Sequence, residues 1–269
     1  NSLNINSKHT KISTIKVKNP ELYFLDKKSR LNIKTKNTNV TASKLAIKGS
    51  NTSISKVTLT NPLIKINDSK NRTKIDVSRI NLTLNSLVSG NSGLLIKTLK
   101  LQNPRIKLRD AKNSINLDTK KLNIYVNKFK QNKKGLFVNS IRVQEPSINF
   151  YNTKDKTKIV AKHIDLSLSG ISNTKNGFKL NKANITNPNI SVILPKQTKK
   201  VETVKTAKKA SKKKAPSKSA TKLDIGPINI KNAVLSFEDK NLQIPFKTTI
   251  TKMQGKISKF KTTRNSTTK

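Results

Sequence analysis

The sequence predicts an all-β fold of repetitive, bent, mostly antiparallel strands that form an elongated curved sheet with an apolar concave face. Three observations predict it. Prolines recur at a constant step of 42 residues, apolar residues alternate with polar ones around each proline, and 33% of the 269 residues are apolar. That fraction is below the roughly 45–50% of a typical globular domain. We therefore expect one apolar face rather than a thick core.

The repeat sets the expected domain organisation. Pro20, Pro62, Pro104, Pro146 and Pro188 mark five copies, and each proline follows Asn except for one that follows Glu. Residues 1–195 are therefore predicted to hold five repeats. Residues 196–222 contain 11 Lys, one Glu and no Leu, Ile or Phe, which predicts a disordered insertion. Residues 223–269 are predicted to begin a sixth repeat that continues into a further domain.

Alternating apolar residues predict strands with one apolar face, because side chains on a strand alternate between its two faces. Across each proline the apolar spacing is five, so a straight strand would put the two halves on opposite faces. A bend or bulge at Asn-Pro restores the common face, and proline is tolerated there because it lacks an N–H. The candidate groove-lining residues are Ile15, Val17, Leu22, Phe24, Val57, Leu59, Ile64, Ile66, Leu99, Leu101, Ile106, Leu108, Ile141, Val143, Ile148, Phe150, Ile185, Ile190, Val192, Ile228, Ile230, Leu235 and Phe237.

Turns are expected where each bent strand ends. Asp26, Asp68, Asp110 and Asp239 lie six residues after the bend position, beside Lys, Asn and Ser. Asp favours turns because its carboxylate accepts hydrogen bonds from nearby backbone N–H groups. A second long strand follows each turn and also changes phase near its middle. One repeat is therefore predicted to be two long bent strands in an up-and-down hairpin.

An uncovered apolar face on such a sheet suggests a lipid ligand. Large contiguous apolar surfaces mark binding sites. Acyl chains suit a long apolar trough, because burial of each CH₂ group is non-directional and contributes about 0.8 kcal/mol. The alternative is that the apolar rows pack against a second half of the sheet, which would give a structural or adhesin-like repeat protein with a filled core.

One segment resembles a known family. Residues 225–239, IGPINIKNAVLSFED, with PFKTTI at 245–250 and GKI at 255–257, resemble the AsmA-like superfamily, whose members include TamB-like bridge proteins. The match covers residues 223–260, and Ala233 stands where the family pattern usually has Gly. The resemblance implies a β-groove protein of the Gram-negative periplasm, anchored in the inner membrane, that helps phospholipid reach the outer membrane. The chain is expected to be a piece of a longer protein, with the anchor outside it.

The net charge of +44 comes from 57 Lys and Arg against 13 Asp and Glu. A basic chain suggests binding to nucleic acid. Proteins that recognise bases, however, usually use bidentate Arg hydrogen bonds and stacking aromatic rings. Aromatic residues make up 4% of this chain, and Lys is spread over nearly every turn and polar face. The pattern favours solvation of a large sheet. Anionic lipid head groups or lipopolysaccharide phosphates are the alternative partners for these lysines, and nucleic acid is the weakest reading.

No pattern in the sequence indicates catalysis. His9 and His163 are far apart in the chain, and the 42-residue recurrence of Asp indicates turns rather than paired acid and base groups. The chain has no Cys, and it lacks a P-loop, a GxGxxG motif and an HExxH motif. The expected protein is not an enzyme and needs neither a cofactor nor a metal.

Overall fold

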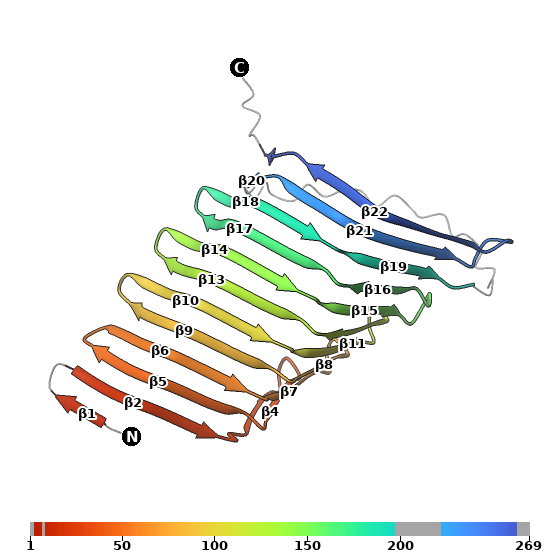
Figure 1. The fold of residues 1–269 in the computed structure, drawn as a ribbon. Coiled ribbons are helices and arrows are strands. Elements are labelled where there is room, and N and C mark those ends of the chain that lie inside the picture. The colour runs from red at the N-terminus through yellow and green to blue at the C-terminus, as the bar shows by residue number, and fades with distance from the viewer. Residues whose placement is uncertain (1–2, 7–8, 197–221, 263–269) are drawn as a thin grey trace, which may run out of the picture.

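A computed structural model describes residues 3–6, 9–196 and 222–262. Most of the predicted disordered insertion, residues 197–221, therefore lies outside the described residues, as do residues 263–269. The described chain forms one large, open, mostly antiparallel sheet, which confirms the predicted all-β class (Figure 1).

Strands of two lengths alternate along the chain. The long strands are β2 (His9–Lys18), β5 (Asn39–Lys48), β6 (Asn51–Thr60), β9 (Asn81–Gly90), β10 (Gly93–Gln102), β13 (Asn123–Asn132), β14 (Gly135–Gln144), β17 (Asp165–Thr174) and β18 (Gly177–Thr186). The short strands are β3 (Leu22–Asp26), β4 (Leu31–Lys36), β7 (Leu63–Asp68), β8 (Thr73–Ser78), β11 (Arg105–Asp110), β12 (Ile115–Lys120), β15 (Ser147–Asn152), β16 (Lys158–Lys162) and β19 (Asn189–Leu194). The remaining strands are β1 (Leu3–Asn6), β20 (Leu223–Ile225), β21 (Ile228–Asp239), β22 (Phe246–Ile257) and β23 (Phe260–Lys261).

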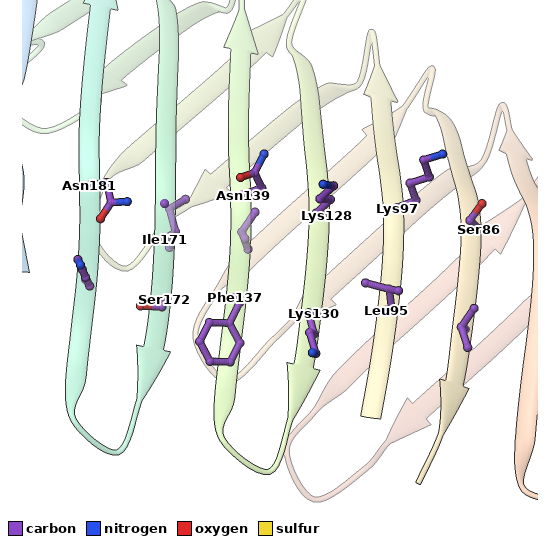
Figure 2. Close-up of a pocket in the computed structure, with 14 residues that line it drawn as sticks. Ser86, Leu95, Lys97, Lys128, Lys130, Phe137, Asn139, Ile171, Ser172 and Asn181 are labelled. Carbon is purple, nitrogen blue, oxygen red and sulfur yellow. The ribbon is translucent and has the colours of Figure 1, made fainter. Parts of the chain in front are cut away.

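Each 42-residue unit runs up one long and one short strand and returns along the next pair. The long strands lie side by side, and the short strands lie side by side beyond them (Figure 1). The predicted up-and-down hairpin therefore describes these units correctly. The short strands leave the plane of the long strands and lie behind them in the view of Figure 2.

The bend between long and short strands is built on residues in the left-handed conformation. On the upward path these are Asn19, Asn61, Asn103, Glu145 and Asn187, with φ between 48° and 54°. On the return path they are Asn37, Arg79, Lys121 and His163, with φ between 55° and 58°. Such a residue interrupts the alternation of side chains, so the apolar residues before and after it share one face. This is the change of phase that the odd spacing predicts.

Side chains next to these left-handed residues are among the most buried in the protein. Pro62 and Pro104 are fully buried, and Ile80 and Thr38 are 8% and 7% exposed. These side chains form a row across the sheet at the bend. A row on the outside of a bend would face solvent, so the burial of these side chains places them on the inside of the bend. The apolar face continues through the row, and it is therefore the concave face of the bend.

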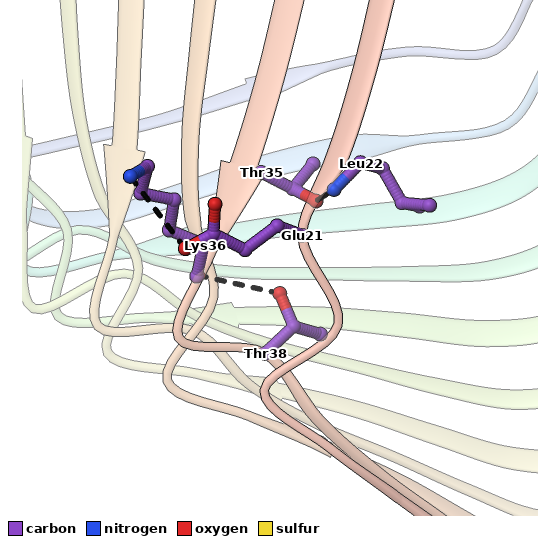
Figure 3. Close-up of polar contacts among 5 residues, drawn as sticks. All are labelled: Glu21, Leu22, Thr35, Lys36 and Thr38. Atoms are coloured by element: carbon purple, nitrogen blue, oxygen red, sulfur yellow. Dashed lines mark hydrogen bonds and ion pairs between the residues drawn. The ribbon is translucent and has the colours of Figure 1, made fainter.

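Polar groups near the bend find local partners, as Figure 3 shows for the first unit. The backbone N–H of Leu22 donates to Thr35 Oγ1 at 3.3 Å, and Thr38 Oγ1 donates to the Lys36 carbonyl at 3.4 Å. The first contact recurs two units later, where the Ile106 N–H donates to Thr119 Oγ1 at 3.3 Å. Threonine hydroxyls thus hydrogen-bond to backbone donors and acceptors next to the bend without placing a charge on the apolar face.

A second interruption lies within the long strands, and the sequence reasoning missed it. Lys44, Ser86, Lys128 and Gly170 are left-handed, with φ of 53°, 51°, 51° and 61°, again 42 residues apart. Cross-strand register is the same on both sides of this position, so the sheet is kinked without a slip in pairing. The kink keeps a further set of apolar residues on the concave face.

The predicted Asp turns are confirmed. Asp26 accepts hydrogen bonds from the N–H groups of Lys28 and Ser29 at 2.9 and 3.2 Å, and from Ser29 Oγ at 2.6 Å. Asp68 and Asp110 bind the N–H and side-chain amide of the Asn three residues later, at 2.7–3.0 Å. In the last turn the Asn241 N–H donates to Asp239 at 2.8 Å.

Because of these turns, the stability of the folded chain depends on pH in the acidic range. Side-chain and backbone hydrogen bonds lower the pKa of Asp26, Asp68 and Asp110 below the ordinary value of 3.8. Near that pH the unfolded chain therefore binds more protons than the folded chain, so this stabilisation is complete above about pH 5 and is lost as pH falls through the lowered pKa values. We expect the double variant Asp68→Asn/Asp110→Asn to unfold a few degrees below the unchanged chain at pH 6. The difference in melting temperature should narrow progressively as the pH falls below 3.8, and a difference that does not change with pH would contradict the assignment.

The sixth unit joins the sheet by parallel pairing, which the predicted mostly antiparallel sheet leaves open. Strand β21 pairs in parallel with β18 and β19, and β20 pairs in parallel with β18. The chain leaves β19 at Leu194, and it re-enters at Leu223 beside Phe178, at the opposite end of the β18–β19 path. Because the chain re-enters at that end, β20 and β21 run in the same direction as β18 and β19. Antiparallel pairing resumes between β21 and β22.

Candidate functional site

Cross-strand register joins the predicted apolar residues into continuous rows that run across the sheet. Two rows lie on the long strands next to the bend. Their members are Ile15, Ala42, Val57, Leu84, Leu99, Val126, Ile141, Leu168, Ala183 and Ile228, and then Val17, Val40, Leu59, Leu82, Leu101, Ile124, Val143, Leu166, Ile185 and Ile230. Every neighbour within a row is a paired residue on the adjacent strand.

Two further rows lie on the short strands beyond the bend. Their members are Leu22, Thr35, Ile64, Val77, Ile106, Thr119, Ile148, Ala161, Ile190 and Leu235, and then Phe24, Ile33, Ile66, Ile75, Leu108, Leu117, Phe150, Ile159, Val192 and Phe237. The four rows together contain every candidate groove residue predicted from the sequence.

A fifth row, on the far side of the long-strand kink, was not predicted. It comprises Ile12, Leu45, Ile54, Leu87, Ile96, Phe129, Val138, Ile171, Leu180 and Ile225. The prediction also omitted the apolar residues of the return strands from the site. The signal was present as a second odd apolar spacing, three residues from Leu84 to Leu87 and from Ile96 to Leu99, repeated every 42 residues.

The five apolar rows contain no charged side chain. Charged residues make up 26% of the chain, so an unbiased arrangement would place a charge at about one row position in four. Thr35 and Thr119 are the polar members of the rows, and each hydroxyl accepts from a backbone N–H. The composition of the whole chain therefore conceals a separation between five uncharged rows on the concave face and a lysine-rich convex face.

No second layer of described residues covers the apolar rows. Apart from Val138, Ala183 and Thr119, which are 6%, 4% and 7% exposed, their side chains are half-buried or exposed. Exposure is greatest at the first edge of the sheet, where Leu22 and Phe24 are 67% and 55% exposed because β3 has a neighbour on one side only. The filled core expected for a structural or adhesin-like repeat is therefore not found among the described residues.

The other candidate groups stay apart. His163 is an exposed left-handed bend residue, and the turn carboxylates lie at the rim of the sheet on separate units. Within residues 3–6, 9–196 and 222–262, no three His, Asp or Glu side chains gather as metal ligands would. Whether the chain is an enzyme stays a prediction.

Comparison with known proteins yields no relative: no protein-family model matches this chain, and neither a curated protein nor a solved structure matches it significantly. In the part of the chain that the structure describes, we find no helix of the length and apolarity needed to cross a membrane.

Proposed function

We propose that the chain is a non-enzymatic lipid-binding segment whose five apolar rows hold phospholipid acyl chains. The observation that carries the proposal is a continuous, uncharged and incompletely covered apolar face on a chain that is otherwise rich in charge. Contiguous apolar surface of this kind marks a binding surface. Acyl chains match it because they require apolar contact and no directional hydrogen bonds.

The dimensions of the sheet support a path rather than a pocket. From β2 to β21 the rows cross ten strands, and nine steps of about 4.8 Å give a length of about 43 Å. Each CH₂ group kept out of water contributes about 0.8 kcal/mol, so a chain that moves along the rows keeps most of its burial at every step. Such a surface lowers the barrier for a lipid that leaves a bilayer.

The biological setting is part of the same proposal. The similarity of residues 223–260 to AsmA-like proteins suggests a Gram-negative envelope protein, tethered to the inner membrane by a segment outside this chain. In that setting the sheet would assist phospholipid movement between the inner and outer membranes and so support outer-membrane biogenesis. The lysines of the convex face would contact water and anionic head groups.

Photocrosslinking tests the proposal. A crosslinking amino acid at Leu99 or Ile148, both in the apolar rows, is expected to capture phospholipid in cells, because these side chains face the proposed path. The same amino acid at Lys100 or Arg142, on the convex face, provides the matched control. Purified protein should also co-extract phospholipid, detected by mass spectrometry. Equal capture at all four positions, or no lipid in either measurement, would refute an acyl-chain path.

A further inference from the structure

A cavity of about 670 Å³ opens on the convex face of the long strands, across β9, β10, β13, β14, β17 and β18 (Figure 2). We call it the convex-face pocket. One cross-strand row in its lining is Val88, Leu95, Lys130, Phe137, Ser172 and Lys179. The next row, at the long-strand kink, is Ser86, Lys97, Lys128, Asn139, Gly170 and Asn181. Leu95 and Phe137 each precede a member of the fifth apolar row, so they point to the opposite face.

The apolar members of this pocket are exceptions in their cross-strand row. Val88 and Leu95 are 40% and 42% exposed. In the first unit and a half the same cross-strand row holds Lys11, Ala46 and Ser53 instead. The exposed apolar patch is therefore confined to the middle of the sheet and does not follow from the repeat.

Lysines surround that patch without acidic partners. The lining contains Lys97, Lys128, Lys130 and Lys179 and no carboxylate. None of the four belongs to an ion pair of the described residues. Asp224 is the ladder neighbour of Lys179, but its carboxylate pairs with two other lysines at 3.6 Å. The pocket therefore presents uncompensated positive charge beside exposed apolar surface.

Gly170 leaves space within the kink row. Lys44, Ser86 and Lys128 adopt the same left-handed conformation at equivalent positions, so the backbone alone does not require glycine there. A Cβ atom at Gly170 would instead collide with the side chain of Asn181 on the next strand. The absent side chain thus lets Asn181 lie across the kink and line the pocket.

We propose that the convex-face pocket binds one anionic amphiphile, a molecule with a phosphate or carboxylate head and a single apolar chain. The chain packs on Val88, Leu95 and Phe137, and the neighbouring lysines bind the head. The volume falls in the range of about 300–1,000 Å³ typical of small-molecule sites, which suits one chain rather than a whole phospholipid. Most of the lining lies on the opposite face from the five apolar rows, and Val138 and Ile171 of the fifth row also border the pocket. The proposal does not depend on the function of the rows.

Titration calorimetry of the whole chain tests this site. The probe is dodecyl phosphate below its micelle concentration, with dodecyl maltoside and inorganic phosphate as probes that lack the charge or the chain. Saturable binding of dodecyl phosphate is expected, with both other probes about tenfold or more weaker, because charge and apolar contact act together.

Variants separate the pocket from the rest of the surface. Lys97→Gln/Lys130→Gln should weaken binding about tenfold or more. Lys16→Gln/Lys56→Gln makes the same charge change on the same face outside the pocket and should have no effect. Phe137→Ser should also weaken binding, and serine is accommodated in this cross-strand row at Ser53 and Ser172. Ile106→Asp, which alters the apolar rows, should leave this binding unchanged.

Four results would overturn the proposal that this pocket binds a single anionic amphiphile. Equal weakening by both lysine pairs would show general attraction to a basic surface, and equal binding of dodecyl maltoside would show a plain apolar patch. Equal binding of inorganic phosphate would show an adventitious ion only. Binding to vesicles that contain phosphatidic acid, without binding to monomeric dodecyl phosphate, would show that the convex face recognises a membrane surface and not a single molecule.

Discussion

Ile106→Asp is expected to remove most of the lipid that co-purifies with the chain while the sheet remains folded. Ile106 lies between Val77 and Thr119 in a short-strand row, with its side chain half-buried on the concave face. An acyl chain on this row would have to desolvate the new carboxylate, which costs several kcal/mol without a partner. We expect phospholipid per mole of protein to fall about tenfold or more, measured by mass spectrometry after extraction.

The matched control is Arg109→Asp on the same strand. Arg109 is exposed and points to the convex face, because it follows Leu108 of an apolar row. The Arg109→Asp variant introduces the same carboxylate and should leave the lipid content unchanged. Circular dichroism and melting temperature report whether both variants keep the sheet. Equal lipid content in two folded variants would contradict the acyl-chain path.

Asn103→Val is expected to give the largest loss of stability of any single exposed substitution at the bend. Asn103 has φ of 52°, and it precedes the fully buried Pro104. A β-branched residue held in this conformation costs about 1–3 kcal/mol, whereas Asn and Gly adopt it readily. Asn103→Gly keeps the conformation and should lie close to the unchanged chain in its urea midpoint. A valine variant as stable as the glycine variant would show that the bend does not require the left-handed conformation.

Much of the fold could be predicted because the repeat combines several local signals. Constant Pro spacing located the bends, odd apolar spacing across them gave the change of phase, and Asp marked the turns. The kink at Ser86 and its equivalents was missed because no Pro or Asn marks it, and Lys, Ser and Gly occupy the position. The parallel pairing of β21 was missed because it depends on where the chain re-enters the sheet, which is a long-range property without a local pattern.

The sequence placed the apolar residues around each proline on one face and left out the apolar residues of the return strands, and a lipid ligand for that face stays a proposal. Ile15, Leu99 and the other residues around each proline stand in the rows as expected, since alternation alone fixes their face. The partners on the return strands, such as Ala42 and Leu84, follow from register, which the sequence shows only once the turn lengths are known. The convex-face pocket could not be found from periodicity, because Val88, Leu95 and Phe137 break the pattern rather than repeat it.

The constant repeat length fixes the length of the sheet in equal steps. Each 42-residue unit adds two strand positions, so it lengthens every apolar row by about 9.6 Å and leaves the cross-section of the bend unchanged. Insertion or deletion of one whole unit therefore changes only the length of the apolar rows, as in other repeat architectures. A change of any other size would set left-handed residues beside extended ones and interrupt all five rows at once. The length of the apolar rows can therefore vary among such chains in fixed increments, while the packing at the bend and the chemistry of the rows stay the same.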